Sequence, residues 1–159
     1  MAFWKDRMEL NEKVLAYGDN SASIIDFAIV DSQGRITNTI EKGSLFEVRM
    51  KVKFNRDVDA PIFAFTLKNL LGTEICGTNT MYEKVNLSSK KDGDVQAISF
   101  SQRMDLNGGE YLLSLGCTSF EQNNFVVYHR LYDVCSVVVV SDKNTVGFFD
   151  MNSKVQFLD

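Results

Sequence analysis

The segment from Leu45 to Phe54, LFEVRMKVKF, alternates between two kinds of side chain along its whole length. One set is apolar and consists of Phe46, Val48, Met50, Val52 and Phe54. The set between them is mostly charged and consists of Leu45, Glu47, Arg49, Lys51 and Lys53. Successive side chains of a strand point to opposite faces of a sheet. The segment is therefore expected to be an antiparallel strand with one face on a core and the other in water.

Strand signals recur along most of the remaining chain, separated by turn residues. Segments rich in β-branched and aromatic residues are Ala22–Val30, Val95–Met104, Glu110–Cys117 and Phe125–Ser141, and Gly147–Phe157 is expected to close the chain. No segment after residue 13 has the period of a helix. The sequence therefore predicts an all-β fold, an antiparallel β-sandwich of about eight to nine strands.

The stretch Ala60–Thr80 predicts a hairpin at the centre of this fold. It contains two short alternating segments joined by a turn at Leu71-Gly72. Pro61, the only proline of the chain, lies at the entrance of the first segment, where its missing N–H need not break a ladder.

A second turn, Asp105–Gly109, is followed on the next predicted strand by Tyr111. This arrangement resembles the tyrosine corner of immunoglobulin-like sandwiches, in which the phenol hydroxyl binds back to the preceding turn. We therefore assign Tyr111 a structural role.

The N-terminal residues differ in character from the rest. Residues 1–13 contain good helix formers and are interpreted as a short helix packed on the sheet or as a linker to an upstream domain. Residues 14–159 are expected to form a single β-sandwich domain.

Charge and composition exclude several classes of function. The net charge of −4 is the wrong sign for a nucleic-acid partner. No apolar run approaches the roughly 18 residues of a membrane span, and no signal peptide is recognisable, so a cytoplasmic location is expected. Three cysteines without CxxC spacing, Cys76, Cys117 and Cys135, are expected to be reduced thiols in the core.

Motifs for catalysis, metals or cofactors are missing. The chain has no GxxxxGK[ST] phosphate loop, so it is not expected to hydrolyse nucleotide or to be an enzyme on its own. Its single histidine, His129, has no second histidine with which to form a His-rich metal site. We expect neither a metal nor a cofactor.

One row of residues suggests a binding surface instead. If Phe125, Val127 and Leu131 face the core, the alternation places Tyr128, Arg130 and Tyr132 on the opposite face. Aromatic rings pack on the apolar faces of sugar rings, while a guanidinium donates to sugar hydroxyls. An exposed strand face without ligand, or a dimer interface, explains the same row.

The order of several short motifs resembles the C-terminal domain of Wzt-type ATPase subunits of O-antigen polysaccharide ABC exporters. The motifs include Tyr17-Gly18-Asp19-Asn20, Pro61–Phe65, Gly77-Thr78-Asn79-Thr80, and Gly108–Gly116. The similarity spans about residues 14–157. Two positions depart from the pattern, since Ala64 stands where a glycine is expected and Cys76 where an aromatic residue is expected.

The resemblance implies an immunoglobulin-like sandwich that recognises the exported glycan at the inner face of the plasma membrane. It also implies an ATPase domain elsewhere in the parent protein, through which the chain reaches the transporter's membrane subunit, and a homodimer that exchanges its C-terminal strand. Gly147 is placed to act as the hinge of such an exchange.

These inferences lead to one main prediction and two alternatives. The main prediction is non-catalytic glycan recognition by Tyr128, Arg130 and Tyr132, with His129 and Asn79 as weaker candidates. The first alternative is a structural dimerisation module that binds no glycan. The second is an enzyme of a sugar pathway that depends on His129.

Overall fold

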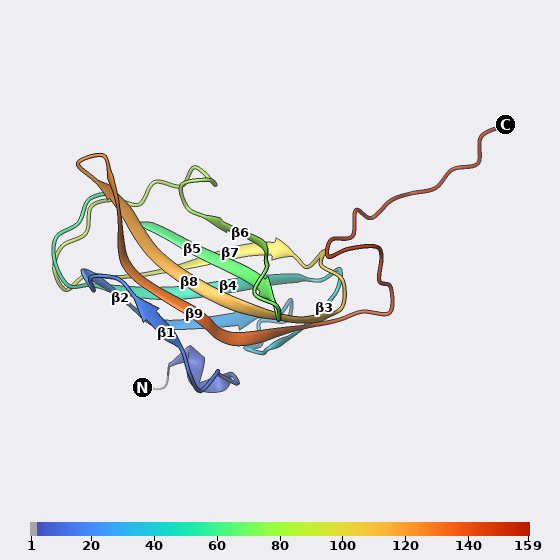
Figure 1. Ribbon diagram of the computed structural model, residues 1–159, viewed down its shortest axis with the longest axis horizontal. Helices are drawn as coiled ribbons and strands as arrows, with labels where there is room; N and C mark the ends of the chain where they lie inside the picture. Colours follow the sequence, from blue (N-terminus) through green and yellow to red (C-terminus); the bar gives the residue numbers. More distant parts are fainter. Residues whose placement is uncertain (1–2) are drawn as a thin grey trace.

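The computed structural model describes residues 3–159 and shows two β-sheets packed face to face (Figure 1). A short 3₁₀ helix, η1 (Trp4–Arg7), precedes nine strands. The strands are β1 (Leu15–Tyr17), β2 (Ala22–Val30), β3 (Thr39–Glu41), β4 (Leu45–Phe54), β5 (Ile62–Asn69), β6 (Glu74–Asn79), β7 (Val95–Arg103), β8 (Gly109–Glu121) and β9 (Asn124–Val140). The predicted all-β sandwich is confirmed.

The two sheets differ in size. The larger has six strands in the order β1-β9-β8-β5-β6, with β3 pairing to the far end of β9, and the smaller has the order β2-β4-β7. All neighbours are antiparallel except β3 and β9, which pair in parallel through Thr39–Glu41 and Val138–Val140. The sandwich is thus antiparallel apart from this one short pair.

Strand β4 follows the alternation of its sequence. Its apolar residues from Phe46 to Phe54 are all buried, whereas its charged residues lie on the outer face of the smaller sheet. Nine residue pairs join β4 to β7 without any shift of register. The burial that the pattern predicts is therefore found over the whole strand.

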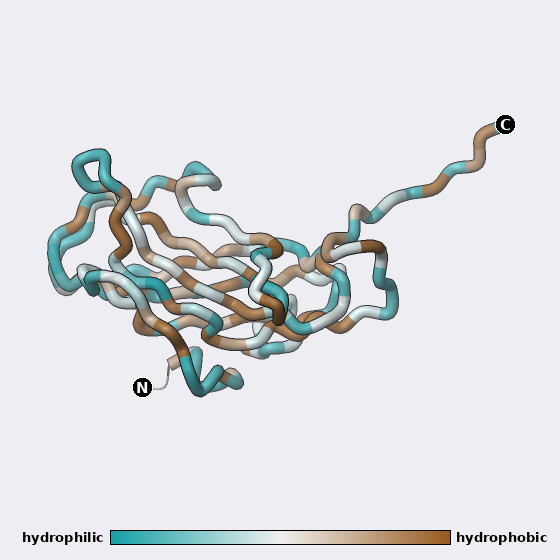
Figure 2. Tube along the Cα trace, viewed as in Figure 1, coloured by the Kyte–Doolittle hydropathy of each residue, from teal (hydrophilic) through white to brown (hydrophobic). Residues whose placement is uncertain are grey.

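Aromatic and branched side chains fill the space between the sheets. Phe54 of β4 stacks on Phe63 of β5 with ring centroids 6.3 Å apart, and Phe65 meets the edge of Phe100 at 5.1 Å. Hydrophobic residues occupy much of the strand region, while the loops at the ends are mostly hydrophilic (Figure 2). These contacts between sheets make one core.

The tyrosine corner is confirmed. The Tyr111 hydroxyl donates to the backbone carbonyl of Asn107 at 2.6 Å, and the residue is buried. Desolvation raises the pKa of Tyr111, so the hydroxyl stays protonated and able to donate.

The N-terminal segment lies against the sandwich. Within residues 3–159, η1 is the only helical stretch, and nothing in the described part of the chain has the length and apolar character of a membrane-crossing helix. The buried carboxylate of Asp26 accepts hydrogen bonds from the backbone N–H groups of Trp4 and Lys5, at 2.9 and 3.0 Å. Residues 1–2 of the segment expected to be a helix or linker lie outside the described residues.

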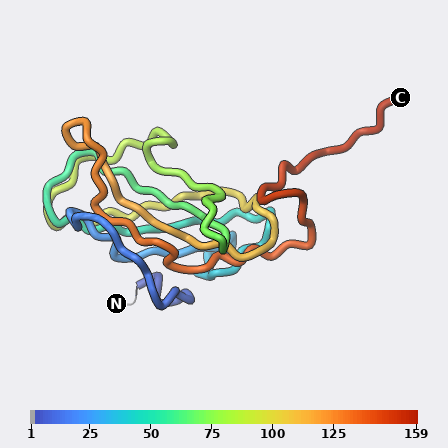
Figure 3. The backbone as a smooth tube through the Cα atoms, in the orientation of Figure 1, coloured from blue at the N-terminus to red at the C-terminus, as the bar shows by residue number. Residues whose placement is uncertain are grey.

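The C-terminal segment does not close the sandwich as a strand. Residues 151–159 extend away from the two sheets (Figure 3), and Val155, Phe157 and Leu158 are 86–100% exposed. The expected strand at Gly147–Phe157 is therefore wrong within its own chain, where only Phe149 forms a bridge, to Leu106.

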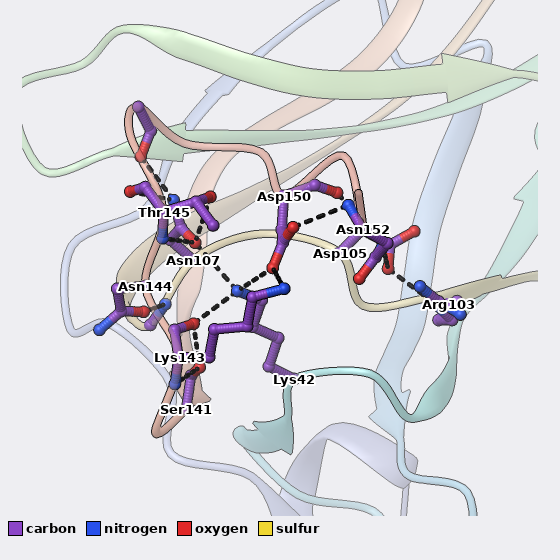
Figure 4. Close-up of polar contacts among 12 residues, drawn as sticks. Lys42, Arg103, Asp105, Asn107, Ser141, Lys143, Asn144, Thr145, Asp150 and Asn152 are labelled. Atoms are coloured by element: carbon purple, nitrogen blue, oxygen red, sulfur yellow. Dashed lines mark hydrogen bonds and ion pairs between the residues drawn. The ribbon is translucent and has the colours of Figure 1, made fainter. Parts of the chain in front are cut away.

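A polar cluster fixes the point where this segment leaves (Figure 4). Buried Asp150 forms salt bridges with the ammonium groups of Lys42, at 2.7 Å, and Lys143, at 3.2 Å. Asn107 donates to the carbonyls of Thr145 and Gly147 and accepts from Lys42. The hydrogen bond from Lys42, with further contacts from Asn152 and Lys143, holds the pKa of Asp150 far below its usual range.

Two of the three cysteines lie where they were expected. Cys117 and Cys135 are buried, and desolvation raises the pKa of Cys135 to about 12. Cys76 is exposed on edge strand β6, so its placement in the core was wrong. An edge strand lacks a neighbour on one side, and the apolar sequence around Cys76 did not reveal that position.

Candidate functional site

A groove of about 370 Å³ lies on the outer face of the six-stranded sheet. Strands β5, β8 and β9 supply its floor and one wall, and β6 with the turn after it supplies the other. This face lies away from the core, so side chains there are free to meet a ligand.

The floor of the groove is made by small residues in the two central strands. Ala64 of β5 pairs with Gly116 of β8, and Gly116 pairs in turn with Arg130 of β9. A Cβ atom placed on Gly116 would lie 3.6 Å from Arg130 Cγ and 4.0 Å from Ala64 Cβ, which are ordinary contacts. Backbone strain therefore does not demand this glycine, and its missing side chain leaves space.

Arg130 and Tyr132 form the wall on the β9 side. The ammonium of Lys68 lies 5.0 Å from the Tyr132 ring centroid, and the Arg130 guanidinium lies 5.7 Å from that of Phe125. Arg130 forms no salt bridge with any residue between 3 and 159. Its donors are therefore available to a ligand.

The opposite wall carries an amide and a second aromatic ring. The Asn79 side-chain oxygen accepts from the backbone N–H of Tyr82 at 2.7 Å, and this bond holds the turn after β6. Tyr82 is 70% exposed and lines the groove. Asn79 was a sequence-based candidate, whereas Tyr82 was missed because it follows the strand in a turn that alternation does not describe.

The wall also continues onto β1. Tyr17 pairs with Arg130 and Leu15 pairs with Tyr132, and both β1 side chains are exposed. Paired residues of adjacent strands share a face, so Tyr17 extends the groove past Arg130. Only the pairing of β1 with β9 identifies Tyr17, and sequence alone does not give that pairing.

Tyr128 does not belong to the groove. It is fully buried, and its hydroxyl donates to Glu121 at 2.9 Å. The register explains this, since Cys117 pairs with His129 while Thr118 pairs with Val127, which leaves Tyr128 as the extra residue of a β-bulge. The bulge reverses the alternation, so the prediction that Tyr128 lies in the outward row was wrong.

Burial has a measurable consequence for this tyrosine. Desolvation, with the hydrogen bond to Glu121, raises the pKa of Tyr128 to about 12. The Arg56 guanidinium lies 5.3 Å from the ring centroid and donates to the same Glu121 carboxylate. Tyr128 is thus part of a structural cluster at the loop end of the sandwich.

His129 also faces away from the groove. It pairs with buried Cys117, and its Nδ1 accepts the backbone N–H of Ile24 from the other sheet at 2.9 Å. Desolvation lowers the pKa of His129, which favours the neutral ring that this bond requires. Its predicted place beside the ligand row was wrong, because His129 alternates with Arg130 and so faces the other sheet when Arg130 faces the groove.

The groove thus combines Arg130, Tyr132 and Asn79 of the predicted set with Tyr82, and Tyr17 lies on the same face beside Arg130. These groups offer aromatic faces, amide donors and a guanidinium. Residues 3–159 contain no grouping of three or more His, Cys, Asp or Glu side chains suited to a metal ion. The chemistry of the groove is suited to non-covalent binding of a neutral or weakly polar ligand.

Nine strands in two sheets, with a tyrosine corner and a groove on one open face, define an immunoglobulin-like sandwich domain. The comparisons with known proteins narrow this class. The chain belongs to the Wzt C-terminal domain family, whose model matches residues 13–151. The resemblance inferred from the motif order is confirmed.

A solved structure agrees with this assignment over nearly the whole chain. The crystal structure of the C-terminal domain of Wzt is 26% identical, has a TM-score of 0.88, and is matched over 98% of this chain and 95% of that one. No curated protein sequence matches the chain.

Other solved structures have lower sequence identity and lower TM-scores. A CARDB domain from Pyrococcus furiosus is 13% identical at a TM-score of 0.42, matched over 74% of this chain and 90% of its own. A Listeria innocua beta-glucosidase in complex with gluconolactone is 13% identical at a TM-score of 0.44, matched over 79% of this chain and 17% of that enzyme. These two likenesses are too distant to bear on function.

Proposed function

We propose that this domain recognises a polysaccharide of the O-antigen type in the groove of its six-stranded sheet, without catalysis. Membership of the Wzt family supports a role as a domain of an ABC transporter subunit. In that setting the domain works at the cytoplasmic face of the membrane, beside the ATPase domain of its parent protein.

The observation that carries the proposal is the graded size of the side chains across the sheet. Ala64 and Gly116 in the centre are flanked by Tyr17, Arg130 and Tyr132 on one side, and by Asn79 with Tyr82 on the other. A sugar ring needs a shallow floor and an aromatic side wall, with donors for its hydroxyls at the rim. The groove supplies each of these.

The test is a pair of identical substitutions on opposite faces of the molecule. Ala64→Leu fills the groove floor, whereas Ala97→Leu adds the same side chain to the exposed outer face of β7. We expect Ala64→Leu to weaken binding of the source organism's surface polysaccharide by about tenfold or more, measured by calorimetry, because the larger side chain occupies space that the sugar would fill. A tenfold loss corresponds to about 1.4 kcal/mol. Ala97→Leu should stay within about twofold of the wild type.

Two further arms sharpen this result. Tyr132→Ala should weaken binding of the same polysaccharide by a similar factor. An unrelated glycan should bind neither the wild type nor the variants. Equal affinities for Ala64→Leu, Ala97→Leu and the wild type would place the glycan elsewhere. No binding by the wild type would favour the structural alternative that follows.

A second candidate function is dimerisation through the C-terminal segment. Residues 151–159 carry apolar side chains into solvent, and an apolar cleft of about 470 Å³ opens between edge strands β6 and β7, lined by Phe65, Ile98 and Phe100. An exposed apolar terminal strand and an open sheet edge both lack a partner. Exchange of this segment between two copies gives the terminal segment and the open sheet edge a partner.

Light scattering on two lengths of the chain tests the dimer. Removing residues 153–159 keeps Asp150 and its contact with Asn152, so the anchor of the segment remains. We expect the full chain to have the mass of a dimer in solution and the shortened protein to have the mass of a monomer. Equal masses at the same concentration would rule out exchange through this segment.

A further inference from the structure

Strand β9 contains a second irregularity next to the groove, centred on Asp133. Leu113 pairs with Cys135 and Leu115 pairs with Leu131, so Ser114 of β8 faces three residues of β9. Asp133, in the middle of the three, has a φ of +54°, in the left-handed region that non-glycine residues seldom occupy. Such a conformation persists only where surrounding contacts fix it, and it is often found beside functional sites.

The groove side supplies one set of these contacts. The backbone N–H of Asp133 donates to Ser114 Oγ at 2.9 Å, and that hydroxyl donates back to the Asp133 carboxylate at 3.3 Å. The carboxylate also pairs with Lys68 Nζ at 3.6 Å. Since Lys68 lies over the Tyr132 ring, the bulge helps to position two residues that line the groove.

The N-terminal segment supplies the other set. The Asn11 side-chain amide donates to the Asp133 carbonyl at 2.6 Å, and the Asn11 backbone N–H donates to the Val134 carbonyl at 3.0 Å. One residue of the segment thus binds two consecutive carbonyls at the bulge. Upstream, the same segment is held on the smaller sheet by Asp26.

We propose that the groove and the N-terminal segment are coupled through the Asp133 bulge. A glycan that contacts Lys68 or Tyr132 and an N-terminal segment docked through Asn11 stabilise the same conformation of residues 132–134. Each therefore strengthens the other, and the coupling must be reciprocal. The inference rests on the proposed function, because it takes the glycan as the ligand of the groove.

The consequence is a path from the groove to the place where the chain enters the domain. The path needs no movement of the core, because it consists of one hydrogen-bonded bulge with a groove residue on one side and Asn11 on the other. Binding of a ligand in the groove then makes residues 3–11 dock more tightly on the domain.

The first experiment uses the free protein and needs no glycan. Asn11→Ala removes the donor to Asp133, and Asn55→Ala is the matched control, since the Asn55 amide donates to the Asn20 carbonyl and to Ser23 Oγ without touching the N-terminal segment or the Asp133 bulge. Amide hydrogen exchange followed by NMR reads the Asp133 N–H. We expect Asn11→Ala to speed its exchange about tenfold and Asn55→Ala to leave it within about twofold.

The second experiment adds the surface polysaccharide of the source organism. Glycan should slow exchange of the Asn11 N–H in the wild type, and Asn11→Ala should bind the glycan about fivefold more weakly than Asn55→Ala. A purely structural role for Asn11 would not make its own amide respond to glycan.

The outcomes separate the two proposals. If the wild type binds no glycan, the proposed function fails, while the exchange of Asp133 in the two variants still decides whether segment and bulge are linked. If glycan binds and Asn11→Ala matches Asn55→Ala in both exchange and affinity, the coupling is overturned and the proposed function stands.

Discussion

The outer faces of the two sheets of this sandwich differ in character. On the smaller sheet, β4 and β7 pair without a shift of register, and the outer face presents charged residues of β4 beside Ala97, Ser99 and Ser101 of β7. On the larger sheet, β9 contains bulges at Tyr128 and Asp133, and the face is hollowed into a groove. The unshifted β4–β7 pair keeps a charged outer face, although β2 and β4 have one register shift, between Ile24 and Asp26, whereas the bulges of β9 redirect side chains beside the groove.

The largest expected effect concerns the tyrosine that the first bulge turns inward. Tyr128→Ala should lower the free energy of unfolding by about 3–5 kcal/mol, because it removes a fully buried ring and leaves Glu121 without that donor. Tyr132→Ala, four residues along the same strand but on the groove face, should cost less than about 1 kcal/mol. Urea denaturation followed by circular dichroism measures both, and similar losses would contradict the opposite orientations.

The second expected effect tests what holds that bulge in place. Gly18 has a φ of +131°, and a Cβ there would lie 2.4 Å from the Tyr128 carbonyl oxygen. Gly18→Ala should therefore cost about 2–3 kcal/mol, from strain and from displacement of β9. Gly34→Ala is the control, since Gly34 has a φ of +80° with nothing within 4 Å of its added Cβ.

For that control only the backbone penalty applies, about 1 kcal/mol. Thermal unfolding of the two variants and the wild type gives the comparison. If both glycines cost the same, close approach to the bulge contributes nothing to stability.

A third prediction concerns the end of the sandwich where both sheets meet the C-terminal segment. The pKa of Asp150 is lowered by Lys42, so its ion pair stabilises the fold above the pKa of an unfolded carboxyl, about 4. This contribution is lost as the pH falls toward the lower pKa of the folded state.

Asp150→Asn should therefore be less stable than the wild type at pH 7, and the difference should shrink below about pH 4. Urea midpoints of both proteins at pH 7 and in acid measure it. A difference that stays constant at all pH values would show that the charge of Asp150 does not contribute to stability.

The smallest expected effect belongs to the regular face. Lys53 is exposed on β4 and forms no ion pair or side-chain hydrogen bond within residues 3–159, so Lys53→Thr should change the free energy of unfolding by no more than about 0.5 kcal/mol. It should leave glycan affinity unchanged. A larger loss of either would mean that the smaller sheet also carries a site.

The regular half of the molecule was largely predictable from the sequence. The bounds of β4 follow from local alternation, those of β2 from its β-branched and aromatic residues, and the tyrosine corner at Tyr111 from the turn before it. The groove was only partly predictable. Arg130, Tyr132 and Asn79 line it, but Tyr128 does not, because a bulge of one residue reverses alternation without changing composition. His129 does not line it either, because it alternates with Arg130 and faces the other sheet.

Two other features depend on partners that are distant in the sequence. Tyr17 joins the groove because β1 pairs with β9, more than a hundred positions away, and no local pattern gives that pairing. The C-terminal segment has the composition of a strand, yet strand formation requires a free edge to pair with. Composition alone therefore placed a strand where the chain leaves the sandwich.

The pairing of β9 also determines the order in which this domain is able to fold. Strands β1 and β3, from the first quarter of the chain, pair only with β9, which begins at Asn124. During synthesis both must wait until most of the domain has left the ribosome. Contacts of such long sequence separation slow folding to the order of milliseconds to seconds. The larger sheet is thus completed last, and a nascent chain that stops before β9 lacks one wall of the groove.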